Sequence, residues 1–159
     1  MNLHSKNEAS VDNAEIEIME FMIGNEAFGI DVVNVREIMT VQEVTPAALS
    51  HPMVEGLFKP RDILYTVVAL PSFIHNTIVE NNPKDLFILT DYQGMNIAYR
   101  VNAVNGIVRV DRANIRQADR SVGGEHLRIT KGIVTHEGRL ISILDLHQIM
   151  SDIIPKDRQ

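Results

Sequence analysis

Two segments of this chain match each other without a gap, and this internal repeat limits the possible folds more than any other feature. Residues 56–70 align on residues 132–146. Both segments begin with glycine and two apolar residues, continue through a four-residue polar turn and end in an apolar run that closes on leucine. A polar turn between two apolar runs is typical of a β-hairpin, so the repeat indicates a β-rich unit.

A second pair of segments repeats in the same order along the chain. Residues 28–38 align on residues 97–107, an offset of 69 residues, whereas the first pair is offset by 76. Two ordered matches indicate duplication of one unit of about 70 residues, close to the lower limit for an independent core. We therefore expect the two halves to pack tightly on each other.

Short runs rich in valine and isoleucine, separated by turn signals, predict an all-β sandwich or barrel class. A hairpin is expected from residues 18–23 and 27–30 around the Gly24-Asn25 turn. Further strands are predicted at 54–59, 63–70, 86–92, 95–101, 104–110, 129–136 and 140–144. Short helices are predicted at 31–35 and 71–75, and a C-terminal helix at 144–153, where Leu146, Ile149, Met150 and Ile153 share one face.

The charge balance argues against nucleic-acid binding. Fifteen Lys and Arg against twenty-one Asp and Glu give a net charge of −6, whereas nucleic-acid affinity comes mainly from basic clusters. The absence of cysteine permits any compartment. Because the chain begins with polar residues instead of a secretory signal, we expect a cytoplasmic location. We expect residues 1–14 to form a disordered arm and residues 15–153 to form the folded domain with its internal duplication. Residues 154–159 are expected to be a polar tail.

The usual sequence signatures of catalysis and metal binding are missing. The six histidines are too dispersed for a short metal motif, and no GxSxG elbow, P-loop or GxGxxG occurs. A metal site built from distant positions stays open, although solvated or capping histidines are commoner. We therefore expect no catalytic residue, no metal ligand and no cofactor.

Two charged residues, Glu37 and Arg61, allow two contrasting interpretations of their role. The second repeat has Gly106 and Glu137 in their places. They could be unrelated surface charges, which contribute little to stability, or they could line a groove that binds a partner.

Four stretches in a fixed order resemble the CheW-like domain of bacterial chemotaxis: residues 28–38, 51–56, 60–70 and 132–146. The resemblance covers about residues 16–153. It implies a mainly β fold of two intertwined five-stranded SH3-like β-barrels around a shared core, with a few short helices and a C-terminal helix.

The resemblance also implies a function without turnover. Members couple methyl-accepting chemotaxis receptors to the regulatory domain of the histidine kinase CheA, with no direct membrane insertion and an association with receptor arrays through these partners. Matching positions imply receptor contacts at Val33, Val35, Glu37, Ile38 and Arg61. Kinase contacts are implied at Asn34, Met39 and Thr40.

Some positions depart from the family pattern. The turn Lys59-Pro60-Arg61-Asp62 stands where the family has Asn-Leu-Arg-Gly, and because Pro60 fixes φ we expect a different turn geometry. Ala69 and Asn102 stand where the family has acidic residues, which predicts altered internal polar contacts or partner preference.

Two alternatives remain. The string His-Pro-Met-Val-Glu-Gly at 51–56 is similar to the coupling domain of CheV, a family that carries a receiver domain after this one, and the gene past codon 159 distinguishes this case. The other alternative is a small-ligand sensor that uses the apolar seam between the barrels as its pocket.

Overall fold

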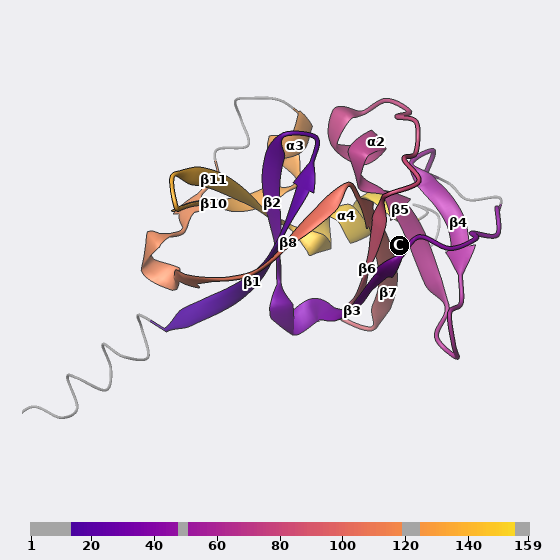
Figure 1. Ribbon diagram of the computed structural model, residues 1–159, viewed down its shortest axis with the longest axis horizontal. Coiled ribbons are helices and arrows are strands. Elements are labelled where there is room, and N and C mark those ends of the chain that lie inside the picture. Colours follow the sequence, from indigo (N-terminus) through magenta and orange to yellow (C-terminus); the bar gives the residue numbers. More distant parts are fainter. Residues whose placement is uncertain (1–13, 48–50, 119–124, 155–159) are drawn as a thin grey trace, which may run out of the picture.

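The strands form two sheets that lie side by side (Figure 1). The computed structural model describes residues 14–47, 51–118 and 125–154; the predicted arm, apart from residue 14, and the predicted tail from 155 onward lie outside these ranges. The first sheet has the order β8(Ala103–Asp111), β1(Glu15–Ile23), β2(Glu26–Asp31), β11(Arg139–Leu144), β10(Thr130–His136), β9(Arg116–Gln117). The second has the order β3(Val35–Thr40), β6(Leu86–Tyr92), β7(Met95–Val101), β5(Tyr65–Ala69), β4(Val54–Phe58).

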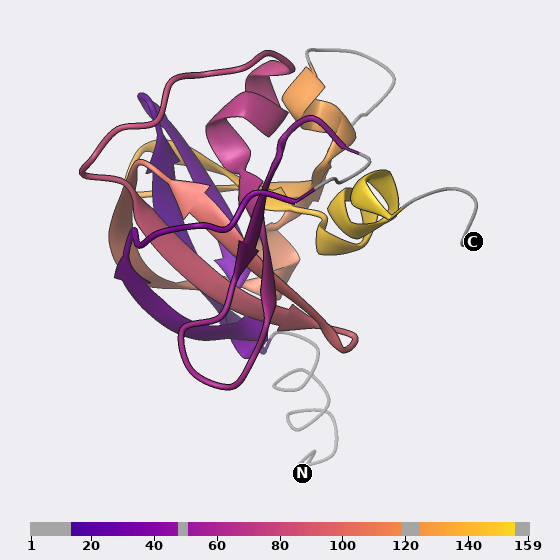
Figure 2. The ribbon, with the colours of Figure 1, turned by 90° about the vertical axis from the view of Figure 1, so that its right-hand side faces the viewer.

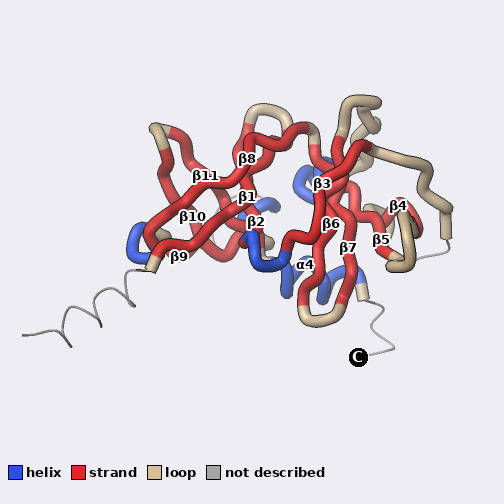
Figure 3. Tube along the Cα trace, turned by 60° about the horizontal axis from the view of Figure 1, so that its bottom comes forward, coloured by secondary structure: helices blue, strands red, loops and turns tan. Residues whose placement is uncertain are grey.

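Short helices connect the strands or follow the last of them. They are α2(Leu70–His75), α3(Glu125–Arg128), α4(Leu146–Ile153) and the 3-10 helices η1(Val32–Asn34) and η2(Arg112–Asn114). Helix α2 lies against α3 (Figure 2), and α4 lies between the sheets (Figure 3). The mainly β fold class is therefore confirmed.

Most predicted strands occur within a residue or two of their expected bounds, and three elements differ in detail. The strand expected from residue 63 begins at Tyr65, the C-terminal helix begins at Leu146, and the helix expected at 31–35 is the 3-10 turn η1. Strand β3 was not predicted at all. Its register against β6 shifts between Val35 and Glu37, and this β-bulge disrupts the alternation that marks a strand.

The two halves of the chain exchange strands. Hairpin β1–β2 joins β8, β10 and β11 from the second half, while hairpin β6–β7 joins β3, β4 and β5 from the first. Two parallel pairs close the exchange, with Phe28 opposite Ser142 and Ile97 opposite Thr66. The 69-residue offset relates Phe28 to Ile97 and the 76-residue offset relates Thr66 to Ser142, so the pairing follows the repeat residue by residue.

The glycine that opens each repeated segment lies beside a bulge. Register shifts occur between Val54 and Gly56 and at the matching place between Thr130 and Gly132. Gly56 has φ +152°, and a Cβ there would lie 2.2 Å from the backbone oxygen of Thr45. Only glycine allows β4 to approach the preceding segment this closely.

Three apolar clusters make up the core. The largest draws residues from both sheets and from α2 and α4. Each barrel has a smaller interior cluster, around Ile18 and Ile141 in the first and Phe87 and Val67 in the second. Since the largest cluster belongs to neither barrel alone, the barrels share a core.

The two departures at Ala69 and Asn102 have physical consequences in this fold. The Asn102 amide donates to Asp85 Oδ1 at 3.1 Å and accepts from the Gly24 amide at 2.7 Å, which links β7 to the β1–β2 turn. An aspartate could not donate to Asp85, so asparagine suits this contact. Ala69 gives α2 no side-chain cap, whereas Asp145, its counterpart in the repeat, accepts from the Gln148 amide.

His51 is held in its neutral form at the junction of the helices. Its ring stacks on Phe73 at 5.0 Å, and its Nδ1 accepts a hydrogen bond from the Met53 amide at 3.1 Å. Burial lowers the pKa of His51, which the Asp152 charge opposes and the Arg128 charge reinforces. Below the ordinary pKa of about 6.5, the unfolded chain therefore binds a proton more readily than the folded one.

We expect the free energy of unfolding to fall as the pH drops from about 6.5 toward the lower folded pKa of His51. The measurement is urea unfolding at several pH values, on the natural sequence and on His51→Asn. Asparagine keeps an acceptor for the Met53 amide but does not titrate, so its profile should be flatter in this window. Identical profiles for the two proteins would contradict the assignment.

Candidate functional site

Glu37 and Arg61 meet in a two-pronged ion pair. Arg61 Nη1 donates to Glu37 Oε1 at 2.7 Å, and Nη2 donates to Oε2 at 2.8 Å. The two residues are 24 positions apart and come from β3 and from the turn between β4 and β5. The two side chains therefore meet at the surface, and their role in binding a partner stays a prediction.

The local backbone brings these two side chains together. Strand β3 is the end strand of the second sheet, and Glu37 lies opposite Leu89 directly after the bulge. Pro60 precedes Arg61 in the turn, where its fixed φ limits the paths the turn can take. A rigid turn facing a bulged edge strand presents a fixed guanidinium–carboxylate pair at the surface.

The pair keeps both of its charges over a wide pH range. The hydrogen bond from Arg61 lowers the pKa of Glu37, and the hydrogen bond to Glu37 raises the pKa of Arg61. Because both side chains are substantially exposed, solvent screens their attraction and the pair contributes little to folding. The pair holds two opposite charges at the surface, and their contact with a partner stays a prediction.

Arg36 is a second anchored charge on β3. Its guanidinium donates to Asp91 Oδ2 at 2.8 Å, to Asn96 Oδ1 at 2.7 Å and to the Tyr65 hydroxyl at 3.2 Å. The hydrogen bond with Tyr65 raises the pKa of Arg36 further. These contacts tie the bulge of β3 to β5, β6 and β7, so they hold Glu37 in position.

Apolar residues border the ion pair. Ile63 and Leu64 are exposed, and Pro60, Arg61, Asp62, Ile63 and Tyr65 line a shallow pocket of about 200 Å³. We call Glu37, Arg61, Ile63 and Leu64 the β3 surface. Arginine is one of the residue types that are enriched at protein-binding surfaces, which makes the β3 surface a candidate for a contact.

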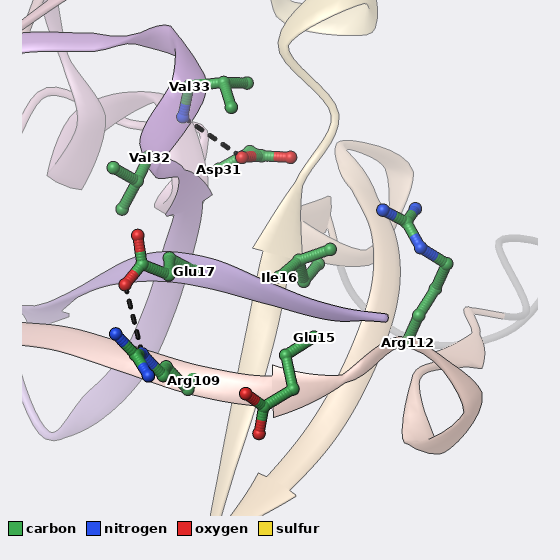
Figure 4. A pocket seen from close by; sticks show the side chains of 8 residues that line it. All are labelled: Glu15, Ile16, Glu17, Asp31, Val32, Val33, Arg109 and Arg112. Atoms are coloured by element: carbon green, nitrogen blue, oxygen red, sulfur yellow. Dashed lines mark hydrogen bonds and ion pairs between the residues drawn. The ribbon is translucent and has the colours of Figure 1, made fainter. Parts of the chain in front are cut away.

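The other predicted receptor-binding residues do not line the pocket beside the ion pair. Val35 and Ile38 are half-buried and pack against the shared core. Val33 is 84% exposed and lines a different hollow with Glu15, Glu17 and Arg109 (Figure 4). The structure brings together Glu37 and Arg61, while Val33 belongs to a separate place on the surface.

The predicted kinase-binding residues follow the same strand. Asn34 ends η1 and is half-buried, Met39 packs against the interior of the second barrel, and Thr40 is exposed. Of these three, Thr40 has the exposure that a direct contact needs. Their role stays a prediction.

Sequence reasoning missed Arg36, Ile63 and Leu64. Arg36 lies inside the 28–38 stretch, but nothing in the sequence shows that the β-bulge directs the Arg36 side chain toward Asp91 and Tyr65. Ile63 and Leu64 were assigned to a strand, and strand residues are expected to be buried on one face. The adjacent Pro60 was the available signal that the turn extends further.

No metal centre or membrane span stands out in the described ranges. Within residues 14–47, 51–118 and 125–154, no three His, Asp or Glu side chains lie close enough to hold a metal ion. No helix in this part of the chain is long and apolar enough to cross a membrane.

Comparison with known proteins gives a consistent result. The sequence model of the CheW-like domain matches residues 17–153. The chain is 27% identical over 143 residues to the chemotaxis protein CheW of Thermotoga maritima, covering 90% of this chain and 93% of that protein. It is 22% identical over 152 residues to the chemotaxis protein CheW of Treponema pallidum, covering 93% and 89%.

A solved structure supports the fold. The scaffolding protein TtCheW from Thermoanaerobacter tengcongensis superposes with a TM-score of 0.72 at 18% identity, covering 81% of this chain and 88% of that one. At this identity the similarity bears on the fold alone.

Proposed function

The chain belongs to the CheW-like domain family, and from this membership we propose that it is a non-enzymatic adaptor of bacterial chemotaxis. In this role it couples methyl-accepting receptors to the regulatory domain of the histidine kinase CheA. The observation that carries the proposal is the extent of the match, since relatives named chemotaxis protein CheW align with this chain over about nine-tenths of its length.

We assign the receptor contact to the β3 surface. Its bidentate ion pair fixes two opposite charges, and Ile63 and Leu64 supply exposed apolar area beside them. Transient signalling interfaces are small, and a few central residues contribute most of their binding energy. Arg61 is a strong candidate for such a residue because arginine is enriched at these positions.

The coupling role requires that both partners bind at once. An adaptor raises the local concentration of each partner for the other, and it does so only if the two contacts do not overlap. The two barrels offer separate surfaces for this purpose (Figure 1). Val35, Ile38, Asn34, Met39 and Thr40 lie on or next to the same strand as Glu37, so their division between the two partners remains to be tested.

A binding assay with three components tests the adaptor role. The kinase regulatory domain and a receptor cytoplasmic tip are each titrated with this protein, and then one is titrated against the preformed complex of the other. We expect each to bind alone and both to bind together. Binding of neither partner, or strict competition between them, would contradict coupling.

We expect Arg61→Glu to weaken receptor binding about tenfold or more, because it places two carboxylates together and removes the cation from the β3 surface. The matched control is Arg116→Glu, since Arg116 is also an exposed arginine but lies on β9 of the first sheet, away from Arg61 and outside the hollow of Val33. Circular dichroism should show both variants folded. Receptor binding by Arg61→Glu at the level of the control would remove Arg61 from the contact.

A further inference from the structure

The first barrel has a hollow at one end, and the coupling role does not account for this hollow. Four isoleucines form its apolar lining: Ile16, Ile18, Ile115 and Ile143. Three charged residues complete it: Asp31, Arg112 and Lys131. Its volume is about 270 Å³, and it adjoins a wider hollow of about 520 Å³ that shares Ile16, Asp31 and Arg112. Figure 4 shows Ile16 between the Asp31 carboxylate and the Arg112 side chain.

The second barrel fills the equivalent place with its own side chains. Ile18 lies opposite Asp31 in the first sheet, and Phe87 lies opposite Arg100 at the corresponding position of the second. Lys131 and Glu55 are the equivalent bulge residues of β10 and β4. In the second barrel Arg100 and Glu55 form a buried ion pair, with Arg100 over the Phe87 ring.

The first barrel reverses both charges and leaves them unpaired. An acid, Asp31, stands where the second barrel has Arg100, and a base, Lys131, stands where it has Glu55. Asp31 Oδ1 accepts from the Val33 amide at 3.1 Å, but no cation pairs with Asp31 among the residues that the structure describes. The Arg112 guanidinium and the Lys131 ammonium likewise have no ion-pair partner in the described ranges. One acid and two bases therefore surround an apolar hollow without neutralising one another.

We propose that this hollow binds a free aliphatic α-amino acid as its zwitterion. The ligand's ammonium group pairs with Asp31, its carboxylate with Arg112 and Lys131, and its side chain with the isoleucines. In the second barrel, the chain's own side chains provide an ion pair and apolar bulk at this place. In the first barrel, the ligand supplies the charges opposite to those of the lining residues, together with the apolar bulk. A volume just below the range of drug-sized pockets suits a ligand of this small size.

Isothermal titration calorimetry with L-leucine on the full chain tests the proposal. We expect a dissociation constant of about 1 mM or tighter, as suits so small a ligand. Two analogues isolate the charges, since 4-methylpentanoate lacks the ammonium group and 3-methylbutylamine lacks the carboxylate. We expect each analogue to bind at least about fivefold more weakly than L-leucine, because the charged side chains that would pair with the missing group have no partner.

Variants of the hollow assign the contacts. Asp31→Asn keeps an acceptor for the Val33 amide, and Arg112→Gln and Lys131→Gln are surface changes, so all three should fold. We expect each to weaken L-leucine binding about fivefold or more. Arg116→Gln is the matched control, because Arg116 is an exposed cation of neighbouring β9 that does not line the hollow.

Two results would overturn the proposal. One is the absence of any heat of binding at about 20 mM L-leucine, a concentration far above the expected dissociation constant. The other is binding that Asp31→Asn, Arg112→Gln and Lys131→Gln leave unchanged. Weaker kinase-domain binding by Lys131→Gln, without any response to L-leucine, would instead identify the hollow as a protein contact and would leave the coupling role intact.

Discussion

Arg100→Met is expected to lower the free energy of unfolding by about 3–5 kcal/mol, the usual cost of removing one partner from a buried ion pair. The Arg100 side chain is 6% exposed and donates through Nε and Nη2 to Glu55, with the Nη2 bond at 2.8 Å. Asp85, 2% exposed, lies 3.5 Å from Nη1. Methionine fills similar space but leaves two carboxylates without a counter-charge.

Two acidic neighbours stabilise the charged form of Arg100. Burial lowers the pKa of Arg100, but its hydrogen bond with Glu55 and the charges of Glu55 and Asp85 outweigh this effect and raise it. Arg100 is thus charged at every ordinary pH.

Urea unfolding of Arg100→Met and of Arg109→Met measures the effect. Arg109 pairs with Glu17 on the surface, so its loss should cost less than about 1 kcal/mol. A deficit for Arg100→Met as small as that of this control, at neutral pH, would show that the buried carboxylates are stable without the cation.

The same cluster bears on coupling because it joins the barrels. Asp85 receives hydrogen bonds from the Asn102 side chain and the Asn82 amide, and Asn102 receives the Gly24 amide from the first barrel. This chain of hydrogen bonds adds to the shared apolar core in joining the two barrels. We therefore expect variants of the cluster to disturb two-partner binding more than binding of either partner alone.

The sequence was informative about strands because turns and alternation are local properties. The two repeat offsets of 69 and 76 residues place equivalent residues in equivalent pairs across the whole fold. The exchange of hairpins between halves was not visible in the residues, since both arrangements bury the same faces of the same strands. Only the family resemblance indicated that the barrels are intertwined.

The candidate site was predictable only in part for a related reason. Glu37 and Arg61 came from the resemblance, and their ion pair requires a tertiary contact between an edge strand and a turn 24 residues away. Arg36 escaped notice because its three partners lie on β5, β6 and β7. Periodicity says which face a side chain occupies but not which distant groups it meets.

The second large effect concerns a charge buried inside the first barrel. Glu20 is 1% exposed and accepts from Arg139 Nη2 at 2.9 Å and from Nε at 3.2 Å. We expect Arg139→Leu to lower the free energy of unfolding by about 2–4 kcal/mol, because it leaves the buried carboxylate without a counter-charge. The value is below that for Arg100 because the Arg139 side chain is 46% exposed, so water replaces part of its contact.

The repeat supplies the control for this experiment. The second barrel has Leu89 and Ile63 at the positions of Glu20 and Arg139. Copying them in the double variant Glu20→Leu with Arg139→Ile removes both charges at once, and replacing a buried pair by apolar residues is often neutral or stabilising. We therefore expect the free energy of unfolding of the double variant, measured in urea, to lie within about 1 kcal/mol of that of the natural sequence or above it. A double variant as unstable as Arg139→Leu would mean that the first barrel needs the pair for its packing, and that the two barrels are not interchangeable at this position.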